Sequence, residues 1–293
     1  MKNKLSLFAV PYVGWMSIFV VAPIIIMVVY AFSTAAGDFT LENFARMGTY
    51  TAVFTRSFKL AIIATLIALL IGYPVSYMLS KEGPQVQRIA MVLIMLPMWM
   101  NFLLRTYSWM SILENNGLLN QLFQQIGLID LYNQIAMHFE SDPAAYVPID
   151  HFQMIGTQGA VVLGMVYNYL PFMILPIYSV LVKLDHSLIE AARDLGASSV
   201  QVFHKVILPL SLPGVLSGIT MVFVPSVSTF AISRLLGGGT QMMLGDLIEQ
   251  QFLGGAYNPQ LGAAIALVMM AIVVVCMLVM NRFGDGEEQA VML

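Results

Sequence analysis

Charged residues are scarce in this chain. Asp, Glu, Lys and Arg make up 10% of its 293 residues, and 59% of the residues are apolar. A typical soluble domain carries about 25% charged residues. The mean hydropathy is +0.81. This composition indicates an integral membrane protein, and the net charge of -3 argues against a nucleic-acid partner.

Cysteine is almost absent. The single cysteine, Cys276, lies in an apolar run. One cysteine can form neither an internal disulfide nor a thiolate metal cluster, so we expect no redox site and no metal site. Cys276 is expected to face lipid or to pack as an apolar side chain.

Acidic residues are missing from every stretch that is apolar enough to cross a membrane. Transporters coupled to protons or sodium usually bury such groups to bind their ions, so ion coupling is disfavoured. No lysine follows a glycine, so the phosphate-binding Walker A pattern of P-loop ATPases is missing as well. We therefore expect no cofactor on this chain, and energy supplied by another protein.

An intramembrane enzyme, such as a protease or a lipid transferase, is the alternative from a different class. The sequence has no HExxH motif, and the predicted spans offer no acid for catalysis. All four histidines lie outside those spans; they are His138, His151, His186 and His204. We expect a transport subunit and no catalytic residue.

Six apolar runs predict an all-α membrane protein with six transmembrane helices. A spanning helix needs roughly 20 mostly apolar residues. The predicted spans are residues 7–32, 60–80, 89–104, 159–182, 212–233 and 261–280. The third span is short and is expected to continue outward through Tyr107 and Trp109. The first is long and has no small-residue cleavage site after a short core, which favours a retained helix.

The distribution of positive charge predicts the orientation, because Lys and Arg in short loops stay cytoplasmic. With the N-terminus inside, eight of the 13 basic residues lie inside: Lys2, Lys4, Lys81, Arg88, Lys183, Arg193, Lys205 and Arg282. Five lie outside: Arg46, Arg56, Lys59, Arg105 and Arg234. Both termini are therefore expected in the cytoplasm. The outer segment between spans three and four is acidic, with Glu114, Asp130, Glu140, Asp142 and Asp150.

The outer segment at residues 112–158 is too long for a bare connector. Apolar residues recur in it near helical spacing, which predicts an amphipathic helix at the outer surface. These residues are Leu118, Leu119, Leu122, Ile126 and Ile129. A second amphipathic piece is expected at residues 242–252.

The most polar segment between two long apolar runs is residues 183–209. Ser187 followed three residues later by Glu190 fits a capping box, so a helix is expected to begin there. Gly196 is expected to end it, because a helix C-terminus often needs the left-handed backbone that glycine adopts freely. An apolar stripe is expected along this helix at Leu188, Ala191, Ala192 and Leu195.

A second short helix is expected after Gly196. Ser198 and Gln201 fit its cap, Phe203 is expected to anchor it to the rest of the protein, and Pro209 to end or redirect it. Helices of about nine residues are not stable alone in water, so this pair needs a surface to lie against. An ordinary capped loop and a docking element both fit this pattern.

The order of residues in this segment resembles the EAA signature of the membrane subunits of binding-protein-dependent ATP-binding-cassette (ABC) importers. Val206 stands where that signature usually has isoleucine. The resemblance implies a pair of coupling helices that dock on a separate ATPase subunit, which would carry ATP and magnesium. The residues expected to form the coupling surface are Glu190, Ala191, Ala192, Arg193, Asp194, Gly196, Ala197, Phe203, Leu208 and Pro209.

Three stretches, at residues 96–110, 169–185 and 190–198, resemble the spermidine/putrescine permease family, and within it the first of the two membrane subunits. The resemblance implies a type I ABC importer permease fold in the bacterial cytoplasmic membrane. It also implies three parts: an N-terminal helix and outer loop at 1–56, a permease core at 57–281, and a cytoplasmic tail at 282–293.

The family likeness implies partners and a mechanism. The partners are a second, homologous permease subunit, two copies of an ABC ATPase, an extracytoplasmic binding protein and membrane lipid. Alternating access would carry the cargo inward. Polyamines are the expected cargo, and the alternatives are iron(III), an amino-acid-derived solute or an oxyanion. A tight site for a polycation would need carboxylates, which the spans lack, so the binding protein is expected to provide the selectivity.

Polar residues and prolines within the spans suggest where a path could run. Pro225 lies among hydroxyl side chains that could bind the backbone carbonyl that a helix proline frees, so span five is the candidate for a kinked, pore-lining helix. Ordinary packing of small residues competes with this interpretation. The candidate path residues are Asn101, Tyr167, Asn168, Pro225, Ser226, Ser228, Thr229 and Phe230. Tyr107 and Trp109 fit an interfacial aromatic belt better than a path.

Overall fold

The structure, a computed structural model, describes residues 11–139 and 146–291. The elements in these residues are all helical, which confirms the all-α prediction. They are η1 (Ser17–Val21), α2 (Ala22–Ala31), α3 (Glu42–Arg46), η2 (Met47–Tyr50), α4 (Thr51–Ser80), α5 (Pro84–Trp99), α6 (Phe102–Leu113), α7 (Leu118–Gln125), α8 (Leu128–Phe139), α9 (Gln158–Leu181), α10 (His186–Asp194), α11 (Ser199–Val202), η3 (Phe203–Ile207), α12 (Leu208–Ser228), α13 (Ala231–Leu236), α14 (Leu244–Leu253) and α15 (Pro259–Val291).

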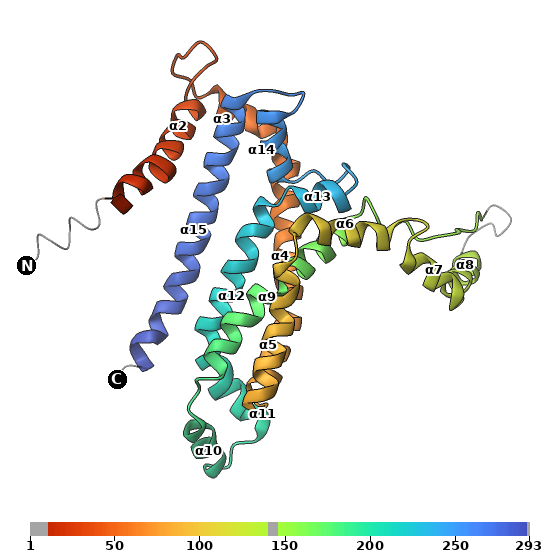
Figure 1. Cartoon of the computed structure of the whole chain (residues 1–293), viewed down its shortest axis with the longest axis vertical. Helices are drawn as coiled ribbons and strands as arrows, with labels where there is room; N and C mark the ends of the chain where they lie inside the picture. Colours follow the sequence, from red (N-terminus) through yellow and green to blue (C-terminus); the bar gives the residue numbers. More distant parts are fainter. Residues whose placement is uncertain (1–10, 140–145, 292–293) are drawn as a thin grey trace, which may run out of the picture.

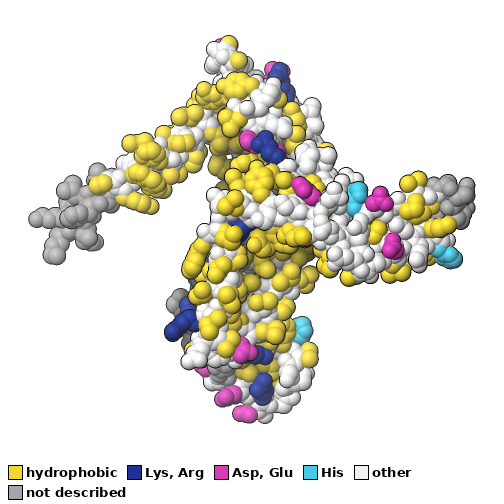
Figure 2. Space-filling view, turned by 45° about the vertical axis from the view of Figure 1, so that its right-hand side comes forward, with side chains coloured by type: hydrophobic (Ala, Val, Ile, Leu, Met, Phe, Trp, Pro, Cys, Tyr) yellow, Lys and Arg dark blue, Asp and Glu magenta, His cyan; other side chains and the backbone are white. Residues whose placement is uncertain are grey.

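The long helices run between two ends of the molecule. In Figure 1, α3 and α14 lie at one end, α10 lies at the other, and α7 and α8 project sideways. On the face shown in Figure 2, hydrophobic side chains cover the flanks of the long helices, while acidic and basic side chains lie mostly near the ends and on the projecting arm. Apolar flanks between polar ends are what a bilayer requires of a spanning bundle.

Five helices in the described residues are long and apolar enough to cross a membrane, and a bent pair makes a sixth. The five are Pro11–Ala31, Glu42–Ser80, Gln158–Leu181, Ser199–Ser228 and Pro259–Met280. They overlap five of the predicted spans; residues 7–10 of the first span lie outside the described residues. The second helix begins earlier than predicted, because Arg56 is accommodated within α4 and donates a hydrogen bond to the Thr240 carbonyl.

The prediction of a continuous third span was wrong. α5 ends at Trp99, Met100 has an extended backbone, and the chain turns by 89° into the helices that follow. Pro97 removes a backbone donor in the last turn of α5. The Asn101 side chain then starts α6 by accepting hydrogen bonds from the N–H groups of Leu103 (2.8 Å) and Leu104 (3.4 Å). Tyr107 and Trp109 therefore lie on a helix that leaves the direction of the span.

The fifth span was predicted to end too late in the chain. α12 runs through Pro213 and Pro225 but ends at Ser228, and Thr229 has an extended backbone before α13 begins at Ala231. α14 lies directly against this break: a Cβ on Gly245 would meet the carbonyl oxygens of Ser228 and Thr229 at 2.4 and 2.5 Å. The prediction continued the helix as far as Ser233 because nothing local in the sequence marks this tertiary contact.

The core consists of α4, α9 and α12. α4 turns a stripe of small buried residues toward its neighbours, and small residues let helices in a membrane approach closely. The stripe is Ser57, Ala61, Ala64, Ala68, Gly72 and Ser76. The Ser76 hydroxyl donates to the Ile174 carbonyl of α9 at 3.1 Å. Gly214 of α12 is so close to α9 that a Cβ there would meet the Pro176 carbonyl oxygen at 2.8 Å.

The segments that were predicted to lie outside contain the amphipathic helices expected from the sequence, with different boundaries. The first forms two helices, α7 and α8, because Gly127 between them has a φ of +72°. The Asn133 side chain of α8 donates a hydrogen bond to the Ile149 carbonyl and accepts one from the Ile149 N–H, which ties this later part of the segment to α8. The second, α14, is docked in the bundle with Leu244 and Leu247 buried. Glu140 and Asp142 of the predicted acidic segment lie outside the described residues.

Candidate functional site: the loop at residues 183–209 and the polar groups of the bundle

The first short helix of the loop, α10, starts at a different cap from the one predicted. Asp185 accepts a hydrogen bond from the Ser187 N–H at 2.9 Å, so the helix begins at His186, and the proposed box of Ser187 with Glu190 was wrong. Asp ranks with Ser as an N-cap, and Asp185 lies two residues earlier in the chain. Glu190 is therefore in the middle of α10 and is exposed.

The end of α10 agrees with the prediction. Gly196 has a φ of +82°. Its N–H donates to the Arg193 carbonyl at 2.8 Å, and the Ala197 N–H donates to the Ala192 carbonyl at 3.1 Å. This pair of bonds is the Schellman pattern, in which a left-handed residue turns the chain sharply out of a helix. The turn sets the direction in which the second helix leaves the first.

The second helix begins as predicted but does not end as predicted. Ser198 and Gln201 form a capping box, with both reciprocal hydrogen bonds present. The helix then passes through the π-helical turn η3 and continues into α12, with Pro209 in its first turn. The wider η3 turn has its closing bond from the Leu208 N–H to the Phe203 carbonyl. Proline is tolerated in the first turn of an α-helix. Pro209 lies in the first turn of α12, directly after the π-helical turn, and does not end the helix.

One face of the loop packs on the bundle. Ile189, Ala192 and Ala197 contact the apolar cluster that contains Val202. Phe203 lies edge-on to two tyrosines of α4: its ring centroid is 5.9 Å from that of Tyr73 and 5.5 Å from that of Tyr77. Aromatic pairs in this arrangement are worth about 0.5–1.5 kcal/mol beyond the area they bury. Leu208 and Pro209 are partly buried where the helix enters the bundle.

The opposite face of the loop exposes apolar side chains. The exposed fractions are 47% for Leu188, 90% for Leu195 and 67% for Val200, and Ala191 is exposed beside them. The predicted stripe is therefore divided, because Ala192 turns inward while Leu188, Ala191 and Leu195 turn outward. We call Leu188, Ala191, Leu195 and Val200 the apolar tip. The charged groups Glu190, Arg193 and Asp194 are exposed as well. Exposed apolar side chains together with exposed charged ones are typical of a protein interface.

The candidate path residues have separate roles in the structure. Asn168 is buried; its amide donates to the Gly164 carbonyl at 2.9 Å, and its side-chain oxygen has no partner. Tyr167 lies edge-on to Trp109 at 5.3 Å between ring centroids. Asn101 caps α6 and is exposed. Asn101 is thus exposed at the start of a helix, while Asn168 is buried.

The hydroxyl groups near Pro225 bind carbonyls of their own helix. Ser226 donates to the Val222 carbonyl at 2.7 Å and Ser228 to the Val224 carbonyl at 3.2 Å. Thr229, which is buried, and Phe230, which is 48% exposed, form the break between α12 and α13. These candidates therefore meet at a helix break that the sequence did not reveal.

Arg105 is a buried charge that was not among the predicted site residues. It was expected in an outer segment, yet it is only 8% exposed, and its Nε and Nη1 atoms are buried without a hydrogen-bond partner. It lies on α6, which packs against α9 and α13. Buried N–H groups without a hydrogen-bond partner are costly, so these two atoms of Arg105 mark a place that a ligand, water or another subunit can complete. Its position directly after an apolar run was the one signal of this in the sequence.

Asp246 is a second buried charge, on α14 outside the spans. One of its carboxylate oxygens accepts from the Met243 N–H at 2.9 Å, and the other is buried without a partner. Burial raises the pKa of Asp246, while the nearby Ser233 hydroxyl, the Met243 N–H and the charge of Arg234 act in the opposite direction. No three His, Cys, Asp or Glu side chains come together to hold a metal in the part of the chain that the structure describes.

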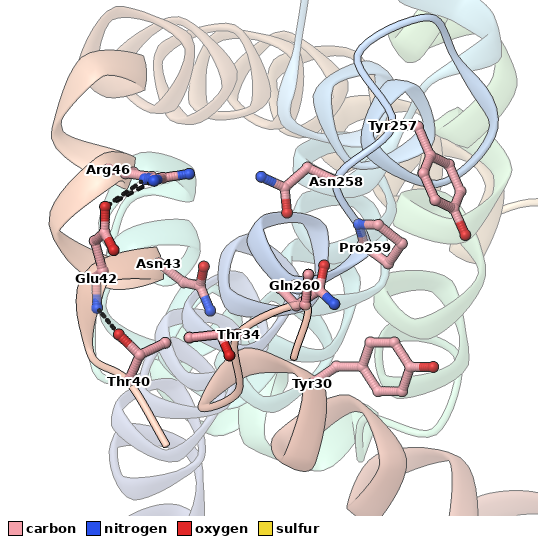
Figure 3. Close-up of a pocket in the computed structure, with 11 residues that line it drawn as sticks. Tyr30, Thr34, Thr40, Glu42, Asn43, Arg46, Tyr257, Asn258, Pro259 and Gln260 are labelled. Atoms are coloured by element: carbon pink, nitrogen blue, oxygen red, sulfur yellow. Dashed lines mark hydrogen bonds and ion pairs between the residues drawn. The ribbon is translucent and has the colours of Figure 1, made fainter. Parts of the chain in front are cut away.

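A polar pocket of about 520 Å³ opens at the end opposite α10. It lies between the chain that follows α2 and the start of α15. Figure 3 shows Arg46 and Asn258 pointing toward one another from opposite walls, with Tyr30 and Tyr257 on one side. Arg46 is paired with Glu42 at 2.7 Å. The pocket offers hydrogen-bonding groups to a partner that approaches this end.

Comparisons with known proteins agree with this geometry. Residues 64–286 match the family model "Binding-protein-dependent transport system inner membrane component". The chain is 35% identical to the spermidine/putrescine transport system permease protein PotB of Haemophilus influenzae, over 93% of each chain. It is also 35% identical to PotB of Escherichia coli K12, over 93% of this chain and 95% of that protein.

Two solved structures share the fold at low sequence identity. A bacterial ABC transporter that imports the acidic polysaccharide alginate matches with a TM-score of 0.76 and 16% identity, over 97% of this chain and 96% of that one. An inward-facing MetNI methionine ABC transporter matches with a TM-score of 0.54 and 18% identity, over 84% of this chain and 98% of that one. At these identities the likeness concerns the fold alone.

Proposed function

The chain belongs to the family of binding-protein-dependent transport system inner membrane components, and from this premise we propose that it is the permease subunit of a polyamine importer. It is an ABC permease, a transport subunit and not an enzyme. The observation that carries the cargo is the 35% identity to two spermidine/putrescine permeases over nearly the whole length of both chains. The proposed cargo is spermidine or putrescine.

The mechanism that we propose places the loop at residues 183–209 in the cytoplasm, with both chain termini. The apolar tip would insert into a groove on an ATPase subunit, because Leu195 and its neighbours are too exposed and too apolar to be left in water. Closure of two ATPase subunits on ATP would pull two such loops together. One loop would come from this chain and one from a second, homologous permease subunit.

A rigid connection is needed to pass this movement into the membrane. It is supplied by the continuous helix Ser199–Ser228, which runs from the loop to the break at Thr229 and Phe230. The packing of Phe203 on Tyr73 and Tyr77 ties the same helix to α4. A displacement of the loop would therefore move α12 and α4 together and open the other end of the bundle.

The outer end would receive an extracytoplasmic binding protein, and the polar pocket beside Arg46 and Asn258 offers it hydrogen bonds. The predicted spans contain no carboxylate to hold a polycation. We therefore assign selection to the binding protein and weak, passing contacts to the membrane path. A purified complex without its binding protein should show no high-affinity binding of spermidine, and high-affinity binding would contradict this division of labour.

Uptake of radiolabelled spermidine tests the cargo. Cells that lack their own polyamine importers and express the complete importer should accumulate spermidine, and unlabelled putrescine should compete while iron(III), amino acids and sulfate should not. Uptake that is absent for polyamines and present for one of the other solutes would contradict the polyamine assignment without affecting the family.

One observation favours an anionic cargo as a second candidate. The buried Nε and Nη1 groups of Arg105 lack partners, and a guanidinium binds carboxylates and oxyanions in a bidentate manner. A di- or tri-cation gains nothing from such a group. If Arg105 contacts the cargo, Arg105→Gln should abolish uptake of an oxyanion; if the cargo is a polyamine, the same variant should retain uptake.

A further inference from the structure

A second cavity lies between the loop and the bundle. Its volume is about 380 Å³, and it is lined by the end of α4, the end of α9, α10 and the start of the continuous helix that begins at Ser199. Ser80 and Lys81 come from α4 and its C-terminal cap, Arg193 from α10 and Ser199 from the continuous helix. Its remaining wall is apolar and includes Leu181. The cavity is separate from the apolar tip, because none of the residues of the tip lines it.

The charge in this cavity has one sign. Lys81 and Arg193 both line it, and no acidic side chain does. The Lys81 ammonium lies 3.8 Å from the centroid of the Tyr77 ring, which also lines the cavity. Neither Lys81 nor Arg193 forms an ion pair with any residue that the structure describes. The acids that neighbour them in sequence are exposed and outside the lining; they are Glu82, Glu190 and Asp194.

The Ser80 hydroxyl already donates to the Tyr77 carbonyl at 2.9 Å, but the two cations and the Ser199 hydroxyl above an apolar wall match one chemical class of ligand. A phosphate group can accept hydrogen bonds from the ammonium, the guanidinium and the Ser199 hydroxyl at once. The apolar wall suits the first carbons of an acyl chain. Basic pockets between transmembrane helices on the cytoplasmic side are known to bind the headgroups of anionic lipids. The cavity lies where α4 and α9 both end, which is the level of the headgroups.

We propose that this cavity binds a phosphate group, carried by an anionic phospholipid of the leaflet beside the loop. The phosphate bridges Lys81 at the end of α4 and Arg193 on α10. It therefore ties the loop to the bundle next to the Phe203 contact, because Tyr77 both lines the cavity and packs on Phe203. An anionic bilayer then stiffens the element that the ATPase pulls. The cytoplasmic placement of this leaflet rests on the proposed function; the binding of phosphate by the cavity does not.

Lipid binding to the complete importer tests the proposal. The purified complex is reconstituted in phosphatidylcholine with increasing phosphatidylglycerol, and bound phosphatidylglycerol is counted by native mass spectrometry for wild type, Lys81→Ala and Lys81→Arg. Arg88→Ala is the matched control, because it removes an exposed cation of the adjoining helix α5 that does not line the cavity. Loss of one charged contact of about 1 kcal/mol predicts phosphatidylglycerol binding about five-fold weaker in Lys81→Ala.

The expected result is weaker binding in Lys81→Ala, with wild-type binding in Lys81→Arg and Arg88→Ala. Addition of inorganic phosphate distinguishes the sources: no displacement of the lipid supports a headgroup, and displacement supports a phosphate site whose natural ligand is soluble. Equal binding in all four proteins overturns the proposal. Failure of the coupling assignment would appear instead as normal spermidine uptake by loop variants, and this readout is independent of lipid counting.

Discussion

The turn at Gly196 offers the sharpest perturbation of the loop. Its φ of +82° lies in the left-handed region, and a Cβ added there would meet no atom within 4 Å. Any penalty for a side chain therefore comes from the backbone and not from a clash. The left-handed conformation costs an ordinary residue about 1–2 kcal/mol. Gly196→Ala should consequently shift the equilibrium between the correctly turned loop and its other conformations by about five- to thirty-fold toward the others.

Proline should do more than alanine at this position. It fixes φ near -65°, which is incompatible with this turn, and it removes the N–H that donates to the Arg193 carbonyl at 2.8 Å. Gly196→Pro should therefore abolish ATP-dependent uptake while the protein still inserts in the membrane, and Gly196→Ala should show an intermediate loss. Aspartate adopts left-handed conformations more readily than most residues, so Gly196→Asp tests the added charge as well as the backbone.

The assay is spermidine uptake normalised to the amount of permease in the membrane. Gly83→Ala is the matched control, because Gly83 lies in the turn between α4 and α5 with a φ of -69°, and a Cβ added to it would meet no atom within 4 Å. It should transport like wild type. Normal uptake by Gly196→Pro would refute the docking role of the loop.

Three further perturbations test other parts of the structure. Leu195→Glu should weaken binding of the ATPase subunit by about thirty-fold, the loss typical of an interface hot spot, while Leu195→Met should retain binding. If the ATPase co-purifies with Leu195→Glu as well as with wild type, docking through the apolar tip is contradicted. Gly214→Ala should lower the melting temperature, because its Cβ would lie 2.8 Å from the Pro176 carbonyl oxygen and overpacking costs about 1–3 kcal/mol. Gly48→Ala is the control, since a Cβ at Gly48 meets no atom within 4 Å and should be accepted. Equal effects of the two substitutions would refute the close α9–α12 contact. Burial raises the pKa of Asp246, so its contribution to stability is fully present below the unfolded pKa of about 3.9 and is lost as the pH rises through the folded pKa. Asp246→Asn should flatten this part of the pH profile of the melting temperature, and parallel profiles for the two proteins would refute the assignment.

Local chemistry made the short-range features of the loop predictable. The left-handed turn at Gly196 and the capping box of Ser198 with Gln201 depend on a few neighbouring residues, and both were predicted from the sequence. The cap of α10 was misassigned because two polar residues, Asp185 and Ser187, compete within three positions, and each is a good N-cap.

Features that depend on packing were not predictable in the same way. The break at Thr229 is fixed by α14, which is distant in sequence. The bend after Trp99 has local causes, Pro97 and the Asn101 cap, but a search for apolar runs does not detect them. Hydropathy places the spans correctly but is insensitive to where a helix turns. Arg105 was missed for the same reason, since its burial comes from helices that lie more than 50 residues away along the chain, at α9 and α13.

The most direct test of the docking assignment is the accessibility of Leu195, which is 90% exposed at the apolar tip. A Leu195→Cys variant in which Cys276 is replaced by serine carries a single thiol. A membrane-impermeant maleimide should label that thiol in inverted vesicles, and bound ATPase should protect it. Labelling in right-side-out vesicles, with no protection by the ATPase, would contradict the assignment.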